Sequence, residues 1–549
     1  MNKLIKIIIC AVVIFANTNI FAQTDKDEIS SALITIENSH FLKDLEFFSS
    51  DELKGRDTGS EGYAIAADYV ANEFKSYKLL PFGDNNSYFQ KVEMSWRQID
   101  KPSVIFEVKN KSRTIMGKFG ENISLLPNRN KFKVDTQQSV VFVGYGNIIT
   151  QLGINDYENV DVKGKTVIAV LGGPKDLKHP EFNDIFQKIR NAELKGANGI
   201  ILFYPDRKAF QNLIFKRIHD VLDRRAISLT DKSLKGSMLD IDMEIGVFAK
   251  LKFIKEIFEI SGLNLNKQLK RIESGEILSK DLGVIINCSY TVKEEVFVCK
   301  NVAGILPGSD SHLKNEYIVV GAHLDHLGIG EPVKEDSVYN GMWDNASGSA
   351  SVLSIARSFF LMKNKPKRSI IFVCYTGEEK GILGSNYFAE KYNSDKGKIV
   401  ACINMDMTGT LFETLDIVPM GYTHSNLKDA VDYSADILGL KISDSKDAEL
   451  DRIERSDQIS FIKQGIPVLN ISHGIIAADP KINAEKKTEK WMKERYHSPF
   501  DDMNQEFSEK DVITAVKLNF LCALFIANQE DEIVWNQNSW LYKKYVVTK

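Results

Sequence analysis

Two histidines and an aspartate stand close together in the segment GAHLDHLG, residues 321–328. The apolar run before it, residues 317–320, is rich in β-formers and predicts a short buried strand. His323, Asp325 and His326 would then stand just beyond the carboxyl end of that strand. In open α/β sheets this edge is where ligands and metals are held. Imidazole and carboxylate side chains at such an edge indicate metal chemistry.

Four more patches place acidic residues or histidine after predicted strands or beside helices. In TGEEKG, Glu378 and Glu379 occupy a loop, where adjacent side chains point different ways, so one can bind a metal while its neighbour acts as a base. Asp344 precedes a predicted helix in GMWDNASG, Asp406 follows a strand in NMDMTG, and His497 lies in YHSPFDD. Taken singly, each is more often a helix cap, a turn or a surface charge. Together, oxygen and imidazole ligands without thiolates suit zinc in a hydrolytic site.

The elements that must position these residues follow a repeated strand, loop and helix pattern after residue 281. Predicted strands are 283–290, 296–306, 317–322, 369–375, 399–404, 414–418, 467–471 and a weaker one near Leu440. Predicted helices are 346–361, 382–392, 425–438, 458–464 and 509–528. This alternation predicts an α/β fold with a doubly wound, mostly parallel sheet. The last helix is strongly apolar, but Lys517 and Asn519 interrupt it, so we expect a core helix and not a membrane span.

Residues 101–280 differ in character from the rest of the chain. Strand-like runs such as 139–143 and 166–171 alternate with glycine turns, and no cluster of metal-binding side chains occurs there. We therefore predict a separate, non-catalytic module. Ahead of it, two helices are predicted between residues 30 and 80. The turn-rich segment between them contains Gly55-Arg56-Asp57, which we interpret as a solvated turn rather than a part of the site.

The N-terminus predicts export. Lys3 and Lys6 precede an apolar core at 7–15, and residues 20–22 form a cleavage site, so 1–22 is predicted to be a signal peptide. At about nine residues the core is too short for a membrane helix, which needs ~20. An N-terminal anchor is the alternative. After cleavage we expect no stable membrane span and a periplasmic or secreted location.

Composition sets the broad class. The chain has 549 residues, of which 43% are hydrophobic and 26% charged, a globular balance that predicts two or more domains. A net charge of -4 argues against nucleic acid as the main partner. Export would permit disulfides. Cys374 and Cys402 lie in strand-like runs and predict buried thiols, whereas Cys288 and Cys299 fall on neighbouring predicted strands, where a pair stays open.

The motifs GAHLDHLG, GMWDNASG, TGEEKGILGS, NMDMTG and YHSPFDD resemble, in order and approximate spacing, those of secreted dinuclear zinc aminopeptidases with an inserted protease-associated (PA) domain. SSDELKGRDTGSEG resembles the N-terminal portion of that family, and VVFVGYG, DVKGKTVIAVL and KGANGIILFY resemble the PA insert. The resemblance implies a signal peptide at 1–22, the N-terminal part of the peptidase domain at 23–100, a β-rich PA insert at 101–280 and the zinc peptidase catalytic domain at 281–549.

Carried over residue by residue, the resemblance implies two Zn2+ ions per chain. One would be held by His323, Asp344 and Asp406. The other would be held by Glu379, His497 and the same Asp344, which bridges the pair.

The resemblance also implies roles for three further carboxylates. Glu378 matches the catalytic base, which would accept a proton from the attacking water and pass it to the leaving amine. Asp325 matches the acid that orients His323 and fixes its tautomer. Asp501 would do the same for His497. A free peptide α-amine bound at one zinc would make the protein an exopeptidase.

Three features depart from the family pattern. The chain reads Ser456-Asp457-Gln458 where Ser-Asp-His is common, which leaves all zinc ligands in place but bears on substrate contacts. Trp343, beside the predicted bridging aspartate, is bulkier than usual and would narrow the pocket. The charged insertion at 472–496 is either a lid over the site or a surface loop, with the lid slightly favoured.

The predicted function is therefore that of an exported zinc aminopeptidase acting on peptides. A carboxypeptidase of the same superfamily would use the same ligands, so it stays open. A glutaminyl-cyclase-like enzyme on the same fold keeps a single zinc and would not need both His323 and Asp406. A binding module with an inactive peptidase fold would have lost metal ligands, and none is missing here.

Overall fold

The computed structural model describes residues 26–37, 41–149, 152–174, 177, 182, 185–205, 215–216, 219, 226–234, 241–391, 397–409, 411–444 and 452–547. The predicted signal peptide, 1–22, lies outside these residues. The chain divides into unit 1, Met1–Val92 with Val298–Lys549, and unit 2, Glu93–Phe297. The predicted insert, 101–280, lies inside unit 2. Each unit is described by itself.

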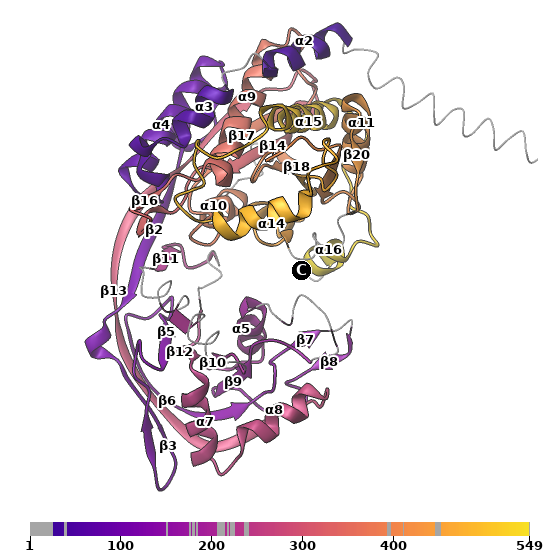
Figure 1. Cartoon of the computed structure of the whole chain (residues 1–549). Helices are drawn as coiled ribbons and strands as arrows, with labels where there is room; N and C mark the ends of the chain where they lie inside the picture. Colours follow the sequence, from indigo (N-terminus) through magenta and orange to yellow (C-terminus); the bar gives the residue numbers. More distant parts are fainter. Residues whose placement is uncertain are drawn as a thin grey trace, which may run out of the picture. The chain divides into compact units, whose positions relative to one another are not determined.

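Four parallel strands form the centre of the sheet in unit 1. Their order is β17 (Ser369–Tyr375), β14 (Glu316–His323), β18 (Lys398–Asn404) and β21 (Val468–His473). These strands are almost wholly buried, which is why their sequences are continuous apolar runs instead of alternating ones. Because the four strands are parallel, their carboxyl ends lie at one edge of the sheet. Strands β17, β14 and β18 lie side by side in Figure 1.

Antiparallel strands complete this sheet on both sides. The outer pairs are β13 (Lys280–Leu306) on β17, β1 (Leu80–Pro81) on β13, and β19 (Asp416–Met420) on β21. A short β20 (Lys441–Ile442) pairs in parallel with β19. The prediction of an α/β fold with a mostly parallel sheet is confirmed.

One face of the sheet is covered by α9 (Ser347–Leu361) and α15 (Glu509–Asn528). The ring centroid of Phe372 on β17 lies 6.1 Å from that of Phe359 on α9. The ring centroid of Phe359 lies 4.8 Å from that of Phe520 on α15. Although α15 is apolar and long enough to cross a membrane, 72% of its most apolar stretch is buried in the protein. It packs here as a core helix, as its interrupted apolar pattern predicts.

The opposite face of the sheet is covered by α10 (Leu383–Lys391) and α13 (Gln458–Ile462). Tyr375, three residues after Phe372 on β17, points to this other face because successive strand side chains alternate. Its ring lies 6.0 Å from Phe388 of α10 and 6.2 Å from Phe461 of α13. Helices on both faces make this the doubly wound arrangement that the sequence predicts.

The remaining elements of unit 1 frame the site. The N-terminal helices pack against α9, and α11 packs against α15. Their bounds are α2 (Lys26–Glu37), α3 (Phe41–Phe48), α4 (Glu61–Ser76), α11 (Lys428–Leu438), α14 (Ala484–Glu494), α16 (Trp540–Tyr542), and the hairpin of β15 (Gly328–Val333) with β16 (Asp336–Tyr339).

Three elements differ from the sequence prediction. The two strands expected at 283–290 and 296–306 are one continuous strand, β13, because the charged residues between them extend the chain without a turn. The hairpin of β15 and β16 was not predicted. Neither was α14, whose sequence AEKKTEKWMKE contains too few apolar residues to signal a helix, although Asn483 caps it by accepting from Lys486 N at 2.9 Å.

Unit 2 contains a mixed sheet with apolar cores on both of its faces. Four strands run in parallel, and the strands at each end of this block are antiparallel. The order is β5 (Ile123–Leu126), β12 (Ile245–Ala249), β10 (Gly199–Phe203), β9 (Thr166–Val170), β6 (Lys133–Phe142), β13, β3 (Ile105–Lys109) and β4 (Thr114–Met116). Two strand pairs lie outside this order, β7 (Ile148–Ile149) with β8 (Ile154–Asn155) and β2 (Phe89–Ile99) with β11 (Ala226–Leu229). The helices of unit 2 are α5 (Ile185–Leu194), α7 (Leu251–Ile260) and α8 (Leu265–Glu273).

The cysteines form no disulfide among the described residues. Cys288, Cys299, Cys374, Cys402 and Cys522 are all free and buried. The pair left open between Cys288 and Cys299 is therefore not formed, and the prediction of buried thiols at Cys374 and Cys402 is confirmed.

Candidate metal centre

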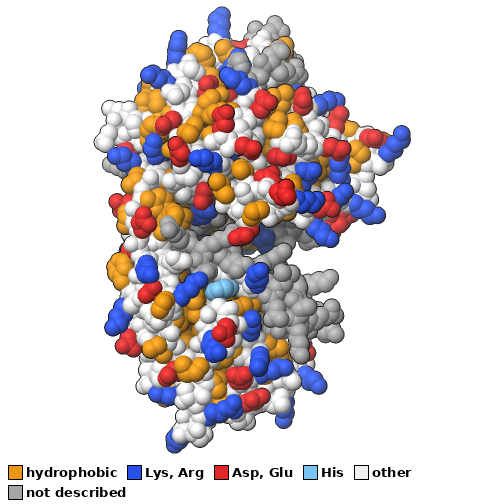
Figure 2. Space-filling view, turned by 60° about the vertical axis from the view of Figure 1, so that its left-hand side comes forward, with side chains coloured by type: hydrophobic (Ala, Val, Ile, Leu, Met, Phe, Trp, Pro, Cys, Tyr) orange, Lys and Arg blue, Asp and Glu red, His pale blue; other side chains and the backbone are white. Residues whose placement is uncertain are grey.

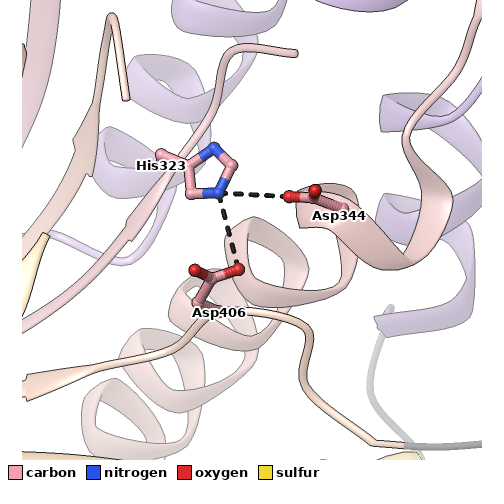
Figure 3. Close-up of side chains that lie close together, drawn as sticks. All are labelled: His323, Asp344 and Asp406. Carbon is pink, nitrogen blue, oxygen red and sulfur yellow. Dashed lines mark ion pairs between the residues drawn. The ribbon is translucent and has the colours of Figure 1, made fainter. Parts of the chain in front are cut away.

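His323, Asp344 and Asp406 converge at the carboxyl edge of the unit 1 sheet. The His323 Nε2 atom lies 3.4 Å from Asp344 Oδ1 and 3.6 Å from Asp406 Oδ1 (Figure 3). One ligand atom from each residue lies within 4.8 Å of the others. The histidine is the last residue of β14, and the two aspartates lie in the loops that precede α9 and follow β18. The structure therefore brings together the whole first set of predicted ligands.

A second group surrounds Glu379 and shares Asp344 with the first. Glu379 Oε2 lies 3.4 Å from His497 Nε2, and Asp344 Oδ2 lies 3.1 Å from the same nitrogen. Asp344 thus presents Oδ1 to His323 and Oδ2 to His497. One carboxylate with its two oxygens turned towards two different imidazoles is the geometry of a bridging ligand.

His326 also reaches this second group. Its Nδ1 atom lies 2.7 Å from Glu379 Oε1, and its ligand atoms fall within 4.8 Å of those of Asp344 and Glu379. The ring is fully buried and meets that of His497 edge-on at 5.8 Å. Sequence reasoning placed His326 at the strand end and assigned it no role. Its position three residues after His323 in HLDH was the available signal.

The carboxylate of Asp325 fixes the turn that carries the two adjacent glutamates. It accepts the backbone N–H of Glu378 at 3.1 Å and that of Glu379 at 3.2 Å, and Thr58 Oγ1 donates to it at 3.0 Å. His323 Nδ1 lies 3.0 Å from the main-chain oxygen of Asp325. The residue predicted to orient His323 thus does so through its backbone, while its side chain positions the glutamates.

The environment pushes the pKa values of the two adjacent glutamates in opposite directions. Burial, with the Glu379 carboxylate nearby, raises the pKa of Glu378 well above its usual range, although His323 opposes this. Burial and the Asp344 carboxylate would also raise the pKa of Glu379. The histidines His497 and His326 outweigh them, so the pKa of Glu379 is lowered. Two carboxyl groups whose pKa values are driven apart in this way are suited to different tasks, proton transfer and charge binding.

Negative charge exceeds positive charge at the centre. Burial alone would lower the pKa of His323 and of His497, but the surrounding carboxylates raise the first well above its usual range and the second to about 9. The hydrogen bonds of both imidazoles hold the pKa of Asp344 well below its usual range despite burial. The environment of each imidazole therefore favours positive charge. This charge can be a proton on the ring, and a metal cation bound to the ring would be favoured for the same reason.

Arg56 lies beneath the centre, fully buried. Its Nε donates to the carbonyl of Leu324 at 2.9 Å, and its terminal nitrogens donate to Asn340 at 2.6 Å, to Gly341 at 3.1 Å and to Phe48. These bonds tie the loop after β14 to the loop before Asp344. The prediction of a solvated turn at this segment is wrong for Arg56.

The turn points this guanidinium inwards because consecutive residues adopt positive φ, Gly55 at 67° and Arg56 at 48°. A Cβ on Gly55 would meet the Tyr339 carbonyl oxygen at 2.3 Å, so only glycine fits. Burial lowers the pKa of Arg56 to about 10, with Asp325 and Asp501 opposing, so it stays charged at neutral pH. No periodic pattern reveals such a residue. The signal was a lone arginine among glycines before a site rich in carboxylates.

Asp501 and Gln458 also differ from expectation. Asp501 accepts the backbone N–H of Trp343 at 2.9 Å and that of Asp344 at 3.0 Å, so it holds the bridging aspartate and not His497. Gln458, which replaces the common histidine, is buried and accepts from Asn404 Nδ2 at 2.8 Å at the end of β18. Its neighbour Asp457 is fully buried, and burial raises its pKa to about 7.

Residues 301–522 match the family model described as "Peptidase family M28". A "Probable leucine aminopeptidase" of Arthroderma benhamiae is 32% identical over 148 residues, 25% of this chain and 38% of that protein. A "Glutamate carboxypeptidase 2 homolog" of Caenorhabditis elegans is 23% identical over 443 residues, 70% of this chain and 53% of the relative. The solved "Aminopeptidase from Aneurinibacillus sp. strain AM-1" has a TM-score of 0.48 at 18% identity, with 95% of this chain and 98% of that one covered.

The family match begins within β13 and ends within α15, and it contains every predicted site residue, namely His323, Asp325, Asp344, Glu378, Glu379, Asp406 and His497. The chain spans 38% and 53% of the lengths of these two curated relatives. The resemblance drawn from the five motifs is confirmed at the level of the family. The chain therefore carries a domain of peptidase family M28.

Proposed function

We propose that this chain is an exported, zinc-dependent exopeptidase that removes N-terminal residues from peptides. The observation that carries the proposal is the shared aspartate. Asp344 stands 3.4 Å from the nitrogen of one imidazole and 3.1 Å from that of another, through different oxygens. Two metal sites with a common carboxylate require this arrangement, and a helix cap or a surface acid does not.

The side chains present fit two zinc ions. His323, Asp344 and Asp406 would hold one, and Asp344, Glu379 and His497 the other, with nitrogen and oxygen ligands only. Of the two histidines beside Glu379, we assign His497 as the ligand because its Nε2 faces two carboxylates, and His326 as the residue that orients Glu379. Zinc bound there would supply Lewis acidity, which polarises a carbonyl group and makes a water molecule more acidic.

Glu378 is assigned the proton transfer. Its side chain is buried beside the ligands, and Asp325 fixes its backbone. As general base it takes a proton from the water that adds to the scissile carbonyl carbon. As general acid it then delivers that proton to the amine nitrogen as the C–N bond breaks. The raised pKa of Glu378 favours the second step. Metal cations held by the neighbouring ligands would favour the ionised form of Glu378 that the first step needs.

Substrate direction is the finer part of the proposal. One relative is named as an aminopeptidase and another as a carboxypeptidase homolog. Removal of an N-terminal residue and removal of a C-terminal residue would use the same metal ligands. A matched set of three peptides separates them, one with free ends, one acetylated at the N-terminus and one amidated at the C-terminus. We expect the acetylated peptide alone to resist cleavage. If the amidated peptide alone resists, the protein is a carboxypeptidase, and if all three resist, the proposed function fails. Glu378→Gln serves as the inactive control.

Unit 2 is proposed to be the PA insert, without a catalytic group and restricting access to the site. The two side-chain groups arranged to hold a metal both come from unit 1, within the part of the chain that the structure describes.

Peptides are the proposed partners. On the face drawn in Figure 2, the acidic and basic side chains of the described residues are interspersed. Export is tested by N-terminal sequencing of the secreted or periplasmic protein, where we expect a start at Gln23.

A further inference from the structure

The segment 472–496, which the sequence left as a lid or a surface loop, contains α14. Most side chains of this helix are exposed or half-buried lysines and glutamates, yet Trp491 is only 4% exposed. A buried tryptophan on this otherwise polar helix is one point at which the segment packs against the rest of unit 1.

Trp491 contacts the residues that directly precede two of the predicted ligands. Its ring lies 4.4 Å from that of Trp343, at 72°, and 6.3 Å from that of Tyr496. Trp343 is followed by Asp344 in the chain. Tyr496 stacks on His497, the next residue, with 3.9 Å between ring centroids and 20° between planes. The bulky Trp343 is therefore buried against α14.

The indole nitrogen of Trp491 begins a chain of hydrogen bonds that ends at the bridging aspartate. Nε1 donates to Gln505 Oε1 at 2.5 Å, and Gln505 Nε2 donates to Asp501 Oδ1 at 2.6 Å. Asp501 in turn accepts the backbone N–H groups of Trp343 and Asp344. Because each polar atom in this buried chain has its partner, the chain fixes one backbone geometry.

The predicted ligands differ in how firmly the secondary structure holds them. His323 ends a buried strand, and its side chain is 1% exposed. His497 lies in a turn, has φ of 54°, and its side chain is 36% exposed. No strand or helix carries it, so its distance from Asp344 depends on what packs behind both residues.

We infer that Trp491 is a positioning residue that sets the spacing between Asp344 and His497, and that the segment 472–496 supports the second metal site from behind. The inference rests on the proposed function, because it assigns a task to a residue around the proposed second zinc. Trp491 touches neither ligand directly and acts through Trp343, Tyr496 and Gln505.

The test compares Trp491→Phe, which keeps an aromatic ring and loses the N–H, with Gln505→Met, which breaks the same chain without touching the ring. The matched control is Trp535→Phe, since the Trp535 indole donates to the Gly465 carbonyl at 2.7 Å elsewhere in unit 1. Two quantities are measured on the full chain. One is the exchange rate of the Trp343 and Asp344 amides in metal-free protein, and the other is zinc affinity by titration.

We expect both variants to speed amide exchange at Trp343 and Asp344 and to weaken the second zinc about 10-fold to 100-fold. The first zinc should be weakened less, because it shares Asp344 but its other ligand His323 ends a buried strand. Their double variant should lose no more than either alone, because both break one chain. Trp535→Phe should match the wild type. Rapid exchange with both zinc affinities unchanged, or slow exchange as in the wild type, would overturn the inference.

The outcome is separable from that of the proposed function. Two zinc ions and peptide cleavage in the wild type, with Trp491→Phe indistinguishable in exchange and affinity, would remove the positioning role and leave the peptidase standing. No zinc in the wild type would remove the proposed function. The exchange measurement on metal-free protein would then still decide whether Trp491 holds the backbone of Asp344, and unchanged exchange would refute it.

Discussion

Among the described residues, both units bury charged side chains, and those of unit 1 gather into a cluster in which carboxylates outnumber cations. In unit 2, the Lys188 ammonium donates to the Tyr145 carbonyl at 2.8 Å, to Asn147 Oδ1 at 2.7 Å and to the Gly172 carbonyl at 3.1 Å. Asp156 accepts the Asn147 N–H at 2.8 Å nearby. In unit 1, several carboxylates face imidazoles, and Arg56 is the buried cation that underlies them.

The difference separates a charge that serves the fold from one that serves a site. A buried charge surrounded by fixed dipoles has its desolvation compensated and needs nothing further. The unit 1 cluster raises the pKa of His497 to about 9, which means that it attracts positive charge that the protein itself does not supply. Burial of charge is thus weak evidence for function, whereas uncompensated charge with ligand geometry is strong.

The largest expected effect breaks the site and spares the fold. Glu378→Gln should lower turnover on the order of 10²–10⁴-fold, about 3–5 kcal/mol of barrier, because the amide cannot transfer the proton. The amide is nearly isosteric, so thermal stability and zinc content should stay as in the wild type. Steady-state kinetics beside elemental analysis checks this, and unchanged turnover would show that the site is misplaced.

Removal of the buried Arg56 guanidinium should lower the free energy of unfolding. Arg56→Met leaves four carbonyl acceptors without their donor and removes the positive charge near Asp325 and Asp501, so we expect a loss of about 3–5 kcal/mol in the free energy of unfolding. Arg56→Lys keeps the charge but not the planar fork and should recover only part of it. Urea unfolding of metal-free protein provides the measurement. A loss below about 1 kcal/mol would mean that Arg56 is dispensable.

The matching change in unit 2 should affect only the fold. Lys188→Met removes the donor from three acceptors and should cost about 1–3 kcal/mol. Zinc content and hydrolysis of a dipeptide-sized substrate should not change, since Lys188 lies outside the proposed machinery. Loss of activity in a variant that remains folded would contradict the assignment of unit 2 as non-catalytic.

The smallest expected effect is a pH dependence within unit 2. Burial raises the pKa of Asp156 from 3.8 to about 6, although Asn147 N–H and Lys188 oppose it. The folded Asp156 therefore binds more protons than the unfolded one between these values. Its contribution to stability is complete below about pH 4 and is lost as the pH rises to about 6. The slope cannot exceed about 1.4 kcal/mol per pH unit. Asp156→Asn should flatten it in unfolding measured across this range, and an unchanged slope would assign it elsewhere.

Much of this contrast could be predicted from the sequence, because strand ends and loop motifs are local. GAHLDHLG ends a recognisable strand, and TGEEKG and NMDMTG follow strands parallel to it, so the convergence of these three motifs at one edge follows from topology. Arg56 could not be predicted, since its burial depends on loops hundreds of residues away. Nor could α14, because one tryptophan in a charged helix gives no periodic signal. The role of the Asp325 backbone in place of its carboxylate is likewise a matter of tertiary geometry.

The most direct test of the account is the zinc content of three purified proteins, the wild type, Glu378→Gln and Glu379→Gln. Since Glu379 is assigned to the metal and Glu378 to the proton, we predict about two zinc ions per chain in the first two proteins and fewer in the third. One zinc in the wild type would favour a cyclase-like site. Two ions in Glu379→Gln with metal lost from Glu378→Gln would contradict the assignment of the two glutamates.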